Sequence, residues 1–164
     1  MGIITGARIG ELCGLTEADI RQVDGLWCID INEDDEGKSI KKKHSKRLVP
    51  LVDGALDFDL GTFLQAPDNG ALPSQNGVNS GKASKVLGKL IRQALGEDQG
   101  EHQTLHSLRH HMAASMKTAG VELQYAQAVT GHASRTVTYD TYGGGIPVQK
   151  KHEAIRKALG EMTA

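Results

Sequence analysis

The chain is 164 residues long, which is enough for one domain with a hydrophobic core and too short for two typical domains. Its composition, 38% hydrophobic and 24% charged residues with a net charge of −1, is that of a globular protein and leaves nucleic-acid binding undecided. No apolar run approaches the roughly 18 residues that cross a membrane, and Cys13 and Cys28 lack the spacing of a metal site, so we expect a reduced cytoplasmic protein.

The first half of the chain is predicted to hold short helices and a small sheet. Residues 8–15 form a predicted helix that ends at Gly14, and Thr16 with Asp19 resembles a capping box for a further turn. Three strands are predicted, at 26–31, 39–42 and 47–51. They would form an antiparallel sheet whose last turn carries a group of lysines.

The second half is predicted to be helical, because its apolar residues recur at helical spacing. The predicted helices span 80–95, 105–119, 122–129 and 147–162. Gly120 and Gly131 are expected to end the second and third of them. The fold class is therefore mostly α with a small antiparallel β-sheet (α+β).

The last predicted helix has an apolar stripe of its own. The stripe comprises Val148, Ile155, Leu159 and Met162. Three glycines at 143–145 form a hinge before it, so we expect the helix to dock on a neighbouring protomer when several copies of the chain assemble. The alternative is that it folds back onto its own core.

A dense basic block follows an acidic run at 33–36. The block comprises Lys38, Lys41, Lys42, Lys43, His44, Lys46 and Arg47. Such a density of cations can contact DNA phosphates whatever the net charge of the chain. A solvated hairpin without a partner is the other interpretation, and for most charge runs it is the commoner one.

Three further motifs carry residues suited to phosphate chemistry. Arg8 and Glu11 are three apart, so the carboxylate can hold the guanidinium in place. His106 and Arg109 share a helix face near a helix start, where anions bind. His132 follows Gly131, and two tyrosines come after it in the chain. Either Tyr139 or Tyr142 could be the functional tyrosine of this motif. Each motif alone is more often a surface ion pair, a capping histidine with a surface arginine, or a buried tyrosine.

The order of the four motifs is more specific than any one of them. Arg, Lys, His-x-x-Arg, Gly-His and Tyr follow one another from Thr5 to Tyr142, in the segments TGARIGEL, LHSLRHHMAASMKTAGV and TGH. This order strongly resembles that of the tyrosine recombinase, or phage integrase, family. The resemblance covers nearly the whole chain and implies site-specific DNA recombination through a 3′-phosphotyrosine intermediate.

The resemblance also implies a role for each residue. Arg8 and Arg109 would clamp the scissile phosphate, with Glu11 supporting the first, because forked guanidiniums suit a phosphate better than lysines do. His106 and His132 would be the two histidine positions, and Tyr142 the nucleophile. Lys42 would protonate the leaving 5′-oxygen, with Lys41 and Lys43 as alternatives. The remaining DNA contacts are assigned to Lys41, Lys43, Lys46 and Arg47.

The implied chemistry requires no cofactor and no metal, because the arginines supply the positive charge. The implied partners are double-stranded DNA and further copies of the chain, as a tetramer on DNA and a monomer or weak dimer in solution. Residues 1–164 would be a C-terminal catalytic domain whose N-terminal core-binding domain is absent. A non-catalytic DNA-binding remnant and a type IB topoisomerase are the alternative functions.

Two features depart from the family pattern. Thr130 stands where the family usually has leucine, and we expect this difference to affect packing only. The interval from His132 to Tyr142 is one residue longer than the commonest one, but Tyr139 would be two residues too short and fits less well.

Overall fold

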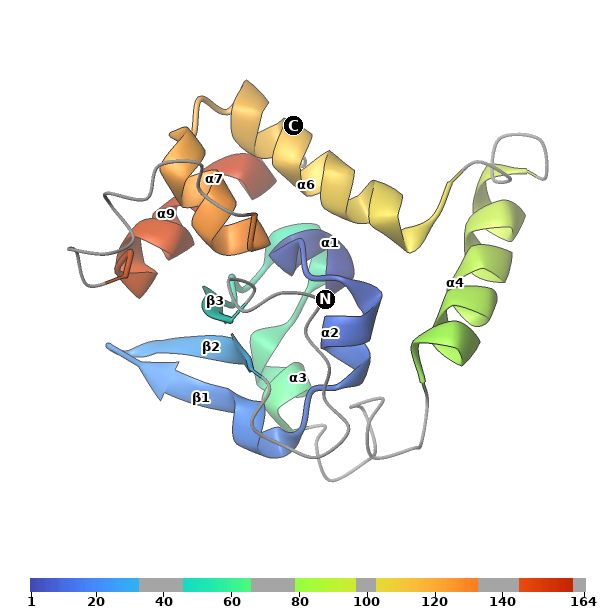
Figure 1. The fold of residues 1–164 in the computed structure, drawn as a ribbon, viewed down its shortest axis with the longest axis horizontal. Helices are drawn as coiled ribbons and strands as arrows, with labels where there is room; N and C mark the ends of the chain where they lie inside the picture. The colour runs from blue at the N-terminus through green and yellow to red at the C-terminus, as the bar shows by residue number, and fades with distance from the viewer. Residues whose placement is uncertain (33–45, 66–78, 97–102, 133–144, 161–164) are drawn as a thin grey trace.

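A computed structural model describes residues 1–32, 46–65, 79–96, 103–132 and 145–160 of the chain (Figure 1). In chain order the elements are α1 (Gly2–Thr5), α2 (Ile9–Cys13), η1 (Glu17–Asp19), β1 (Ile20–Val23), β2 (Leu26–Ile31), β3 (Arg47–Pro50), η3 (Ala55–Asp57), α3 (Leu60–Gln65), α4 (Ser80–Leu95), α6 (Leu105–Thr118), α7 (Leu123–Thr130) and α9 (Val148–Gly160). The predicted class, mostly α with a small antiparallel sheet, is confirmed.

The sheet has the order β1-β2-β3, and both pairs of neighbours are antiparallel. Ile29 in the central strand lies opposite Ile20 on one side and Val49 on the other, and both Ile29 and Val49 are fully buried. The sequence predicted β2 and β3 but not β1, and the predicted strand at 39–42 lies outside the described residues. Residues 20–23 are too short and too polar for a period-two pattern to emerge.

Helices cover one side of the molecule. Figure 1 shows α6, α7 and α9 grouped together, the sheet on the opposite side, α1 between them, and α2 beside the sheet on the side that faces α4. The core joins the two layers through buried side chains that include Ile29, Val49, Met112, Met116, Val129 and Ile155. Helix α4 lies at the edge of the molecule, where it contacts α2 and α6, and it leaves Val86 60% exposed.

Helix α9 folds back and packs on the core of its own chain, which is the second of the two arrangements that the sequence allowed. Val148, Ile155 and Leu159 are all buried, and Met162 lies outside the described residues. The Lys151 ammonium group, itself buried, donates to the carbonyl oxygen of Leu48 at 2.6 Å. This bond ties α9 to β3, the strand that begins at the last residue of the basic block.

We expect Ile155→Ala to lower the free energy of unfolding by about 2–5 kcal/mol, because it would leave a cavity among α9, α6 and α7. Urea denaturation followed by circular dichroism measures the change. Val86→Ala is the control, and should alter stability by less than about 0.5 kcal/mol, since that side chain is exposed. Equal, small effects of the two substitutions would mean that α9 leaves its own core in solution.

Candidate active site

The Arg8 and Glu11 side chains meet at the start of α2, as the sequence predicted. The Arg8 guanidinium donates to Glu11 Oε1 at 2.7 Å, and the Arg8 backbone N–H donates to Oε2, also at 2.7 Å. The second bond fixes the carboxylate against the helix N-terminus, where its charge is favourable. Glu11 therefore holds both the backbone and the side chain of Arg8 in place.

Arg47 is also part of this cluster, although the sequence assigned it to the exposed basic block. Its side chain is only 5% exposed, and its guanidinium donates to Glu11 Oε2 at 2.9 Å and Oε1 at 3.2 Å. Its Nε donates to the carbonyl oxygen of Val129 at 2.7 Å, in the last turn of α7. Arg47 thus links α2, β3 and the end of α7, and its proposed contact with DNA remains untested.

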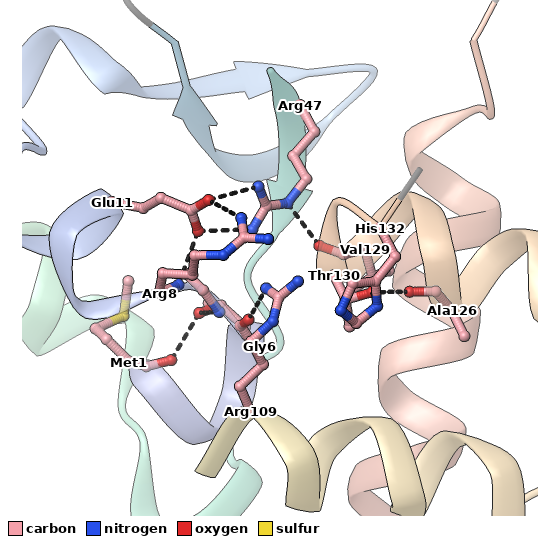
Figure 2. A network of polar contacts seen from close by, with 12 residues as sticks. Met1, Gly6, Arg8, Glu11, Arg47, Arg109, Ala126, Val129, Thr130 and His132 are labelled. Carbon is pink, nitrogen blue, oxygen red and sulfur yellow. Dashed lines mark hydrogen bonds and ion pairs between the residues drawn. The ribbon is translucent and has the colours of Figure 1, made fainter. Parts of the chain in front are cut away.

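Arg109 enters the same region from α6. Its Nη1 donates to the carbonyl oxygen of Gly6 at 2.6 Å, and the residue is only 2% exposed. Its Nη2 is buried and has no hydrogen-bond partner within the described part of the chain. An unpaired buried donor of this kind is costly unless a ligand accepts from it. Figure 2 shows this guanidinium beside Arg8 and His132.

Two glycines allow these segments to approach one another. Gly131 ends α7 with φ +67°, and a Cβ atom there would lie 2.6 Å from Arg47 Nη1. Because Glu11 and Val129 already hold that guanidinium, it could not move aside without losing bonds. Gly6 has φ +62° and turns its carbonyl toward Arg109. The backbone geometry therefore explains why glycine stands at position 6 and at position 131.

His132 follows Gly131 and contacts Thr130 through its ring. Thr130 is 1% exposed, its hydroxyl donates to the carbonyl oxygen of Ala126 at 2.7 Å, and its oxygen lies 2.9 Å from His132 Nδ1 (Figure 2). The expectation that Thr130 affects packing only is therefore wrong, because its hydroxyl is bonded to a histidine of the site.

His106 lies in the first turn of α6, after the N-cap residue Thr104. The imidazole is exposed and meets that of His110 edge to face, with ring centroids 4.5 Å apart. His106 and Arg109 project from the same helix, as their spacing predicted. The helix start favours anions, since its N–H groups point outward.

Three arginines and one glutamate set the electrostatics of the described part of the site. Burial, followed by the positive charges of Arg8 and Arg47, lowers the pKa of Arg109 to about 10. Burial, with Arg109 as the next contributor, also lowers the pKa of His132. For Glu11, burial alone would raise the pKa, but the hydrogen bonds and charges of Arg47 and Arg8 outweigh it and lower the pKa. The structure thus gathers three guanidiniums around one carboxylate, an arrangement that favours an anionic ligand.

Four of the predicted site residues are brought together by the fold, namely Arg8, Glu11, Arg109 and His132. His106 lies one turn before Arg109, and Lys46 is exposed just before β3. Lys41, Lys42, Lys43, Tyr139 and Tyr142 lie outside the described residues. No helix among the described residues is both long and apolar enough to span a membrane.

The chain is similar to several curated proteins of known class. It is 26% identical over 159 residues to tyrosine recombinase XerC of Corynebacterium efficiens, covering 94% of this chain and 47% of that protein. A tyrosine recombinase of Agathobacter rectalis is 31% identical over 139 residues, covering 82% of this chain and 42% of the relative. The transposase from transposon Tn916 of Enterococcus faecalis is 28% identical, covering 96% and 42%. The chain therefore spans less than half the length of these relatives.

The fold also matches a solved structure, that of the Tn1549 transposon integrase in complex with transposon right end DNA. The TM-score is 0.59 at 21% sequence identity, over 99% of this chain and 57% of that one, which shows a shared fold. The family model described as Phage integrase family matches residues 2–143, from α1 through the Gly-His motif to the tyrosines. The chain therefore belongs to the phage integrase family, as the order of its motifs implied.

Proposed function

We propose that this chain is the catalytic domain of a site-specific DNA recombinase that cleaves and rejoins strands through a phosphotyrosine on Tyr142. The observation that carries the proposal is the buried Nη2 of Arg109 beside Arg8, which has no hydrogen-bond partner among the described residues. Two guanidiniums whose like charges repel each other are stabilised by an anion between them. A phosphodiester supplies that anion, and the DNA complex of the Tn1549 integrase supports duplex DNA as its source.

The proposed reaction begins with attack of the Tyr142 phenolate oxygen on the scissile phosphorus. The bond from phosphorus to the 5′-oxygen breaks, and the enzyme remains on the 3′-phosphate. Negative charge grows on the non-bridging oxygens, where Arg8 and Arg109 stabilise it. His106 helps to remove the phenol proton, and Lys42, or Lys41 or Lys43 in its place, protonates the leaving 5′-oxygen.

The rejoining step is the reverse of cleavage. The 5′-hydroxyl of another strand attacks the 3′-phosphotyrosine and releases Tyr142, so no external energy source is needed. Exchange between two duplexes requires several active sites, and we propose a tetramer on DNA and a monomer or weak dimer in solution. The greater length of the relatives supports placing this chain as the catalytic domain of a longer recombinase that acts in the cytoplasm.

A nicked suicide substrate tests the assignment of the nucleophile. The complete recombinase should form a covalent protein–DNA adduct, and Tyr142→Phe should abolish it because phenylalanine has no oxygen to attack phosphorus. Tyr139→Phe is the matched control and should form the adduct normally. An adduct that persists in Tyr142→Phe and disappears in Tyr139→Phe would transfer the nucleophile to Tyr139.

We also expect strand cleavage to proceed in excess chelator. Arginine cations already stabilise the developing charge, which is the role that divalent metals fill in many phosphoryl-transfer enzymes. The rate of adduct formation with and without EDTA measures this. A requirement for magnesium in the cleavage step itself would contradict the proposed division of labour.

A further inference from the structure

The hydroxyl of Thr130 has a single proton, and the structure shows where that proton goes. The carbonyl oxygen of Ala126 can only accept, and it lies 2.7 Å from Thr130 Oγ1. Two oxygens at this distance with no proton between them would repel each other. The Thr130 hydroxyl must therefore donate to Ala126.

The contact between Thr130 and His132 then has only one possible direction. Because the Thr130 proton is committed to Ala126, its oxygen can only accept from His132 Nδ1, which lies 2.9 Å away. A neutral imidazole carries one proton, so placing it on Nδ1 leaves Nε2 as an acceptor. We infer that Thr130 is a positioning residue that holds neutral His132 in the Nδ1–H tautomer.

This tautomer has a consequence for the proposed phosphate site, and that consequence rests on the proposed function. Figure 2 shows the His132 ring beside Thr130, near the Arg109 guanidinium. A phosphate oxygen needs a donor, and Nε2 of the neutral Nδ1–H form has no proton to give. His132 must therefore take up a proton on Nε2 before it can donate to the scissile phosphate.

Proton uptake and phosphate binding are thus coupled at His132. The charged or titratable groups that face the ring come from three segments: Arg8 beside α2, Arg47 on β3, and Arg109 with His110 on α6. Without an anion, burial and the three guanidiniums hold the pKa of His132 below its ordinary value. A bound phosphodiester opposes their charge and favours the imidazolium. The sequence alone could not reveal this coupling. A leucine at position 130 would give the same helix, and only the structure shows the contact between Thr130 and His132.

The tautomer can be measured in the free chain by ¹H–¹⁵N NMR of the His132 ring at a pH where it is neutral. Wild type should show a proton on Nδ1 and an unprotonated Nε2. Thr130→Val keeps the shape but removes the acceptor, so the fraction of Nε2–H should rise, whereas Thr130→Ser should retain the wild-type pattern. An Nε2–H tautomer in wild type would overturn the inference even if Thr130→Val failed to fold.

A second readout is the pH profile of covalent-adduct formation on the suicide substrate. In wild type the rate should fall by up to about tenfold for each pH unit above the pKa of His132 in the complex. Thr130→Val should fall less steeply, because its neutral imidazole can donate from Nε2, and Thr130→Ser should follow wild type. Identical slopes for wild type and Thr130→Val would contradict the coupling. The NMR result needs no DNA, so it stands or fails independently of the proposed recombinase activity.

Discussion

Arg109→Lys is expected to slow covalent-adduct formation by roughly 10²–10³-fold, the usual cost of losing one preorganised donor at a developing oxyanion. A lysine has one compact ammonium group, so it cannot donate to the Gly6 carbonyl and to a phosphate in the geometry of a guanidinium fork. Single-turnover kinetics on the suicide substrate measure the loss.

The matched control is Arg156→Lys, since Arg156 is an exposed arginine of α9. Its rate should stay at the wild-type value. Thermal melting of Arg109→Lys separates a chemical defect from unfolding, because Arg109 is itself buried. A folded Arg109→Lys protein with the wild-type cleavage rate would remove Arg109 from the phosphate site.

Glu11→Ala is expected to destabilise the chain by roughly 3–5 kcal/mol, the cost of breaking a buried ion pair from one side. Glu11 accepts from both Arg8 and Arg47, and the side chain of Arg47 is 5% exposed, so the substitution would remove the carboxylate that faces a buried positive charge. Urea denaturation measures the difference. Asp30→Ala is the control and should cost no more than about 1 kcal/mol, because its partner Arg21 is 52% exposed.

The same carboxylate makes stability depend on pH. The pKa of Glu11 is lower in the folded chain than in the unfolded one, so its contribution is fully present above the ordinary value of about 4.3. The contribution is lost as the pH falls through the lowered, folded pKa. Wild type should therefore lose stability in this acidic window while Glu11→Gln changes less. Parallel stability curves for the two proteins would mean that Glu11 is not held as an anion.

Much of the helical framework could be predicted from the sequence, because its boundaries are marked locally. Ser80–Leu95 has the predicted bounds, and Gly131 ends α7 in the left-handed conformation that glycine favours. The direction in which α9 docks could not be predicted, since an apolar stripe packs equally well on its own core or on a neighbour. Helix α1, only four residues long, is too short to show a periodic pattern.

Only part of the candidate site could be predicted from the sequence, and most of the contacts between its residues could not. Arg8 with Glu11 follows from their spacing, because residues three apart share a helix face. The burial of Arg47 could not be predicted because its neighbours in sequence are lysines, and burial of this charge depends on a partner 36 positions away. The role of Thr130 also depends on three-dimensional contacts, namely with Ala126 and His132.

If Arg109 neutralises the scissile phosphate, removing the negative charge from the substrate should make this arginine far less important. A methylphosphonate at the cleavage site replaces one non-bridging oxygen with a methyl group, so the linkage is neutral. The rate penalty of Arg109→Ala should be at least about tenfold smaller on this substrate than on the normal phosphodiester, because less charge needs stabilising. Equal penalties on the two substrates would contradict the claim and leave Arg109 with a structural role alone.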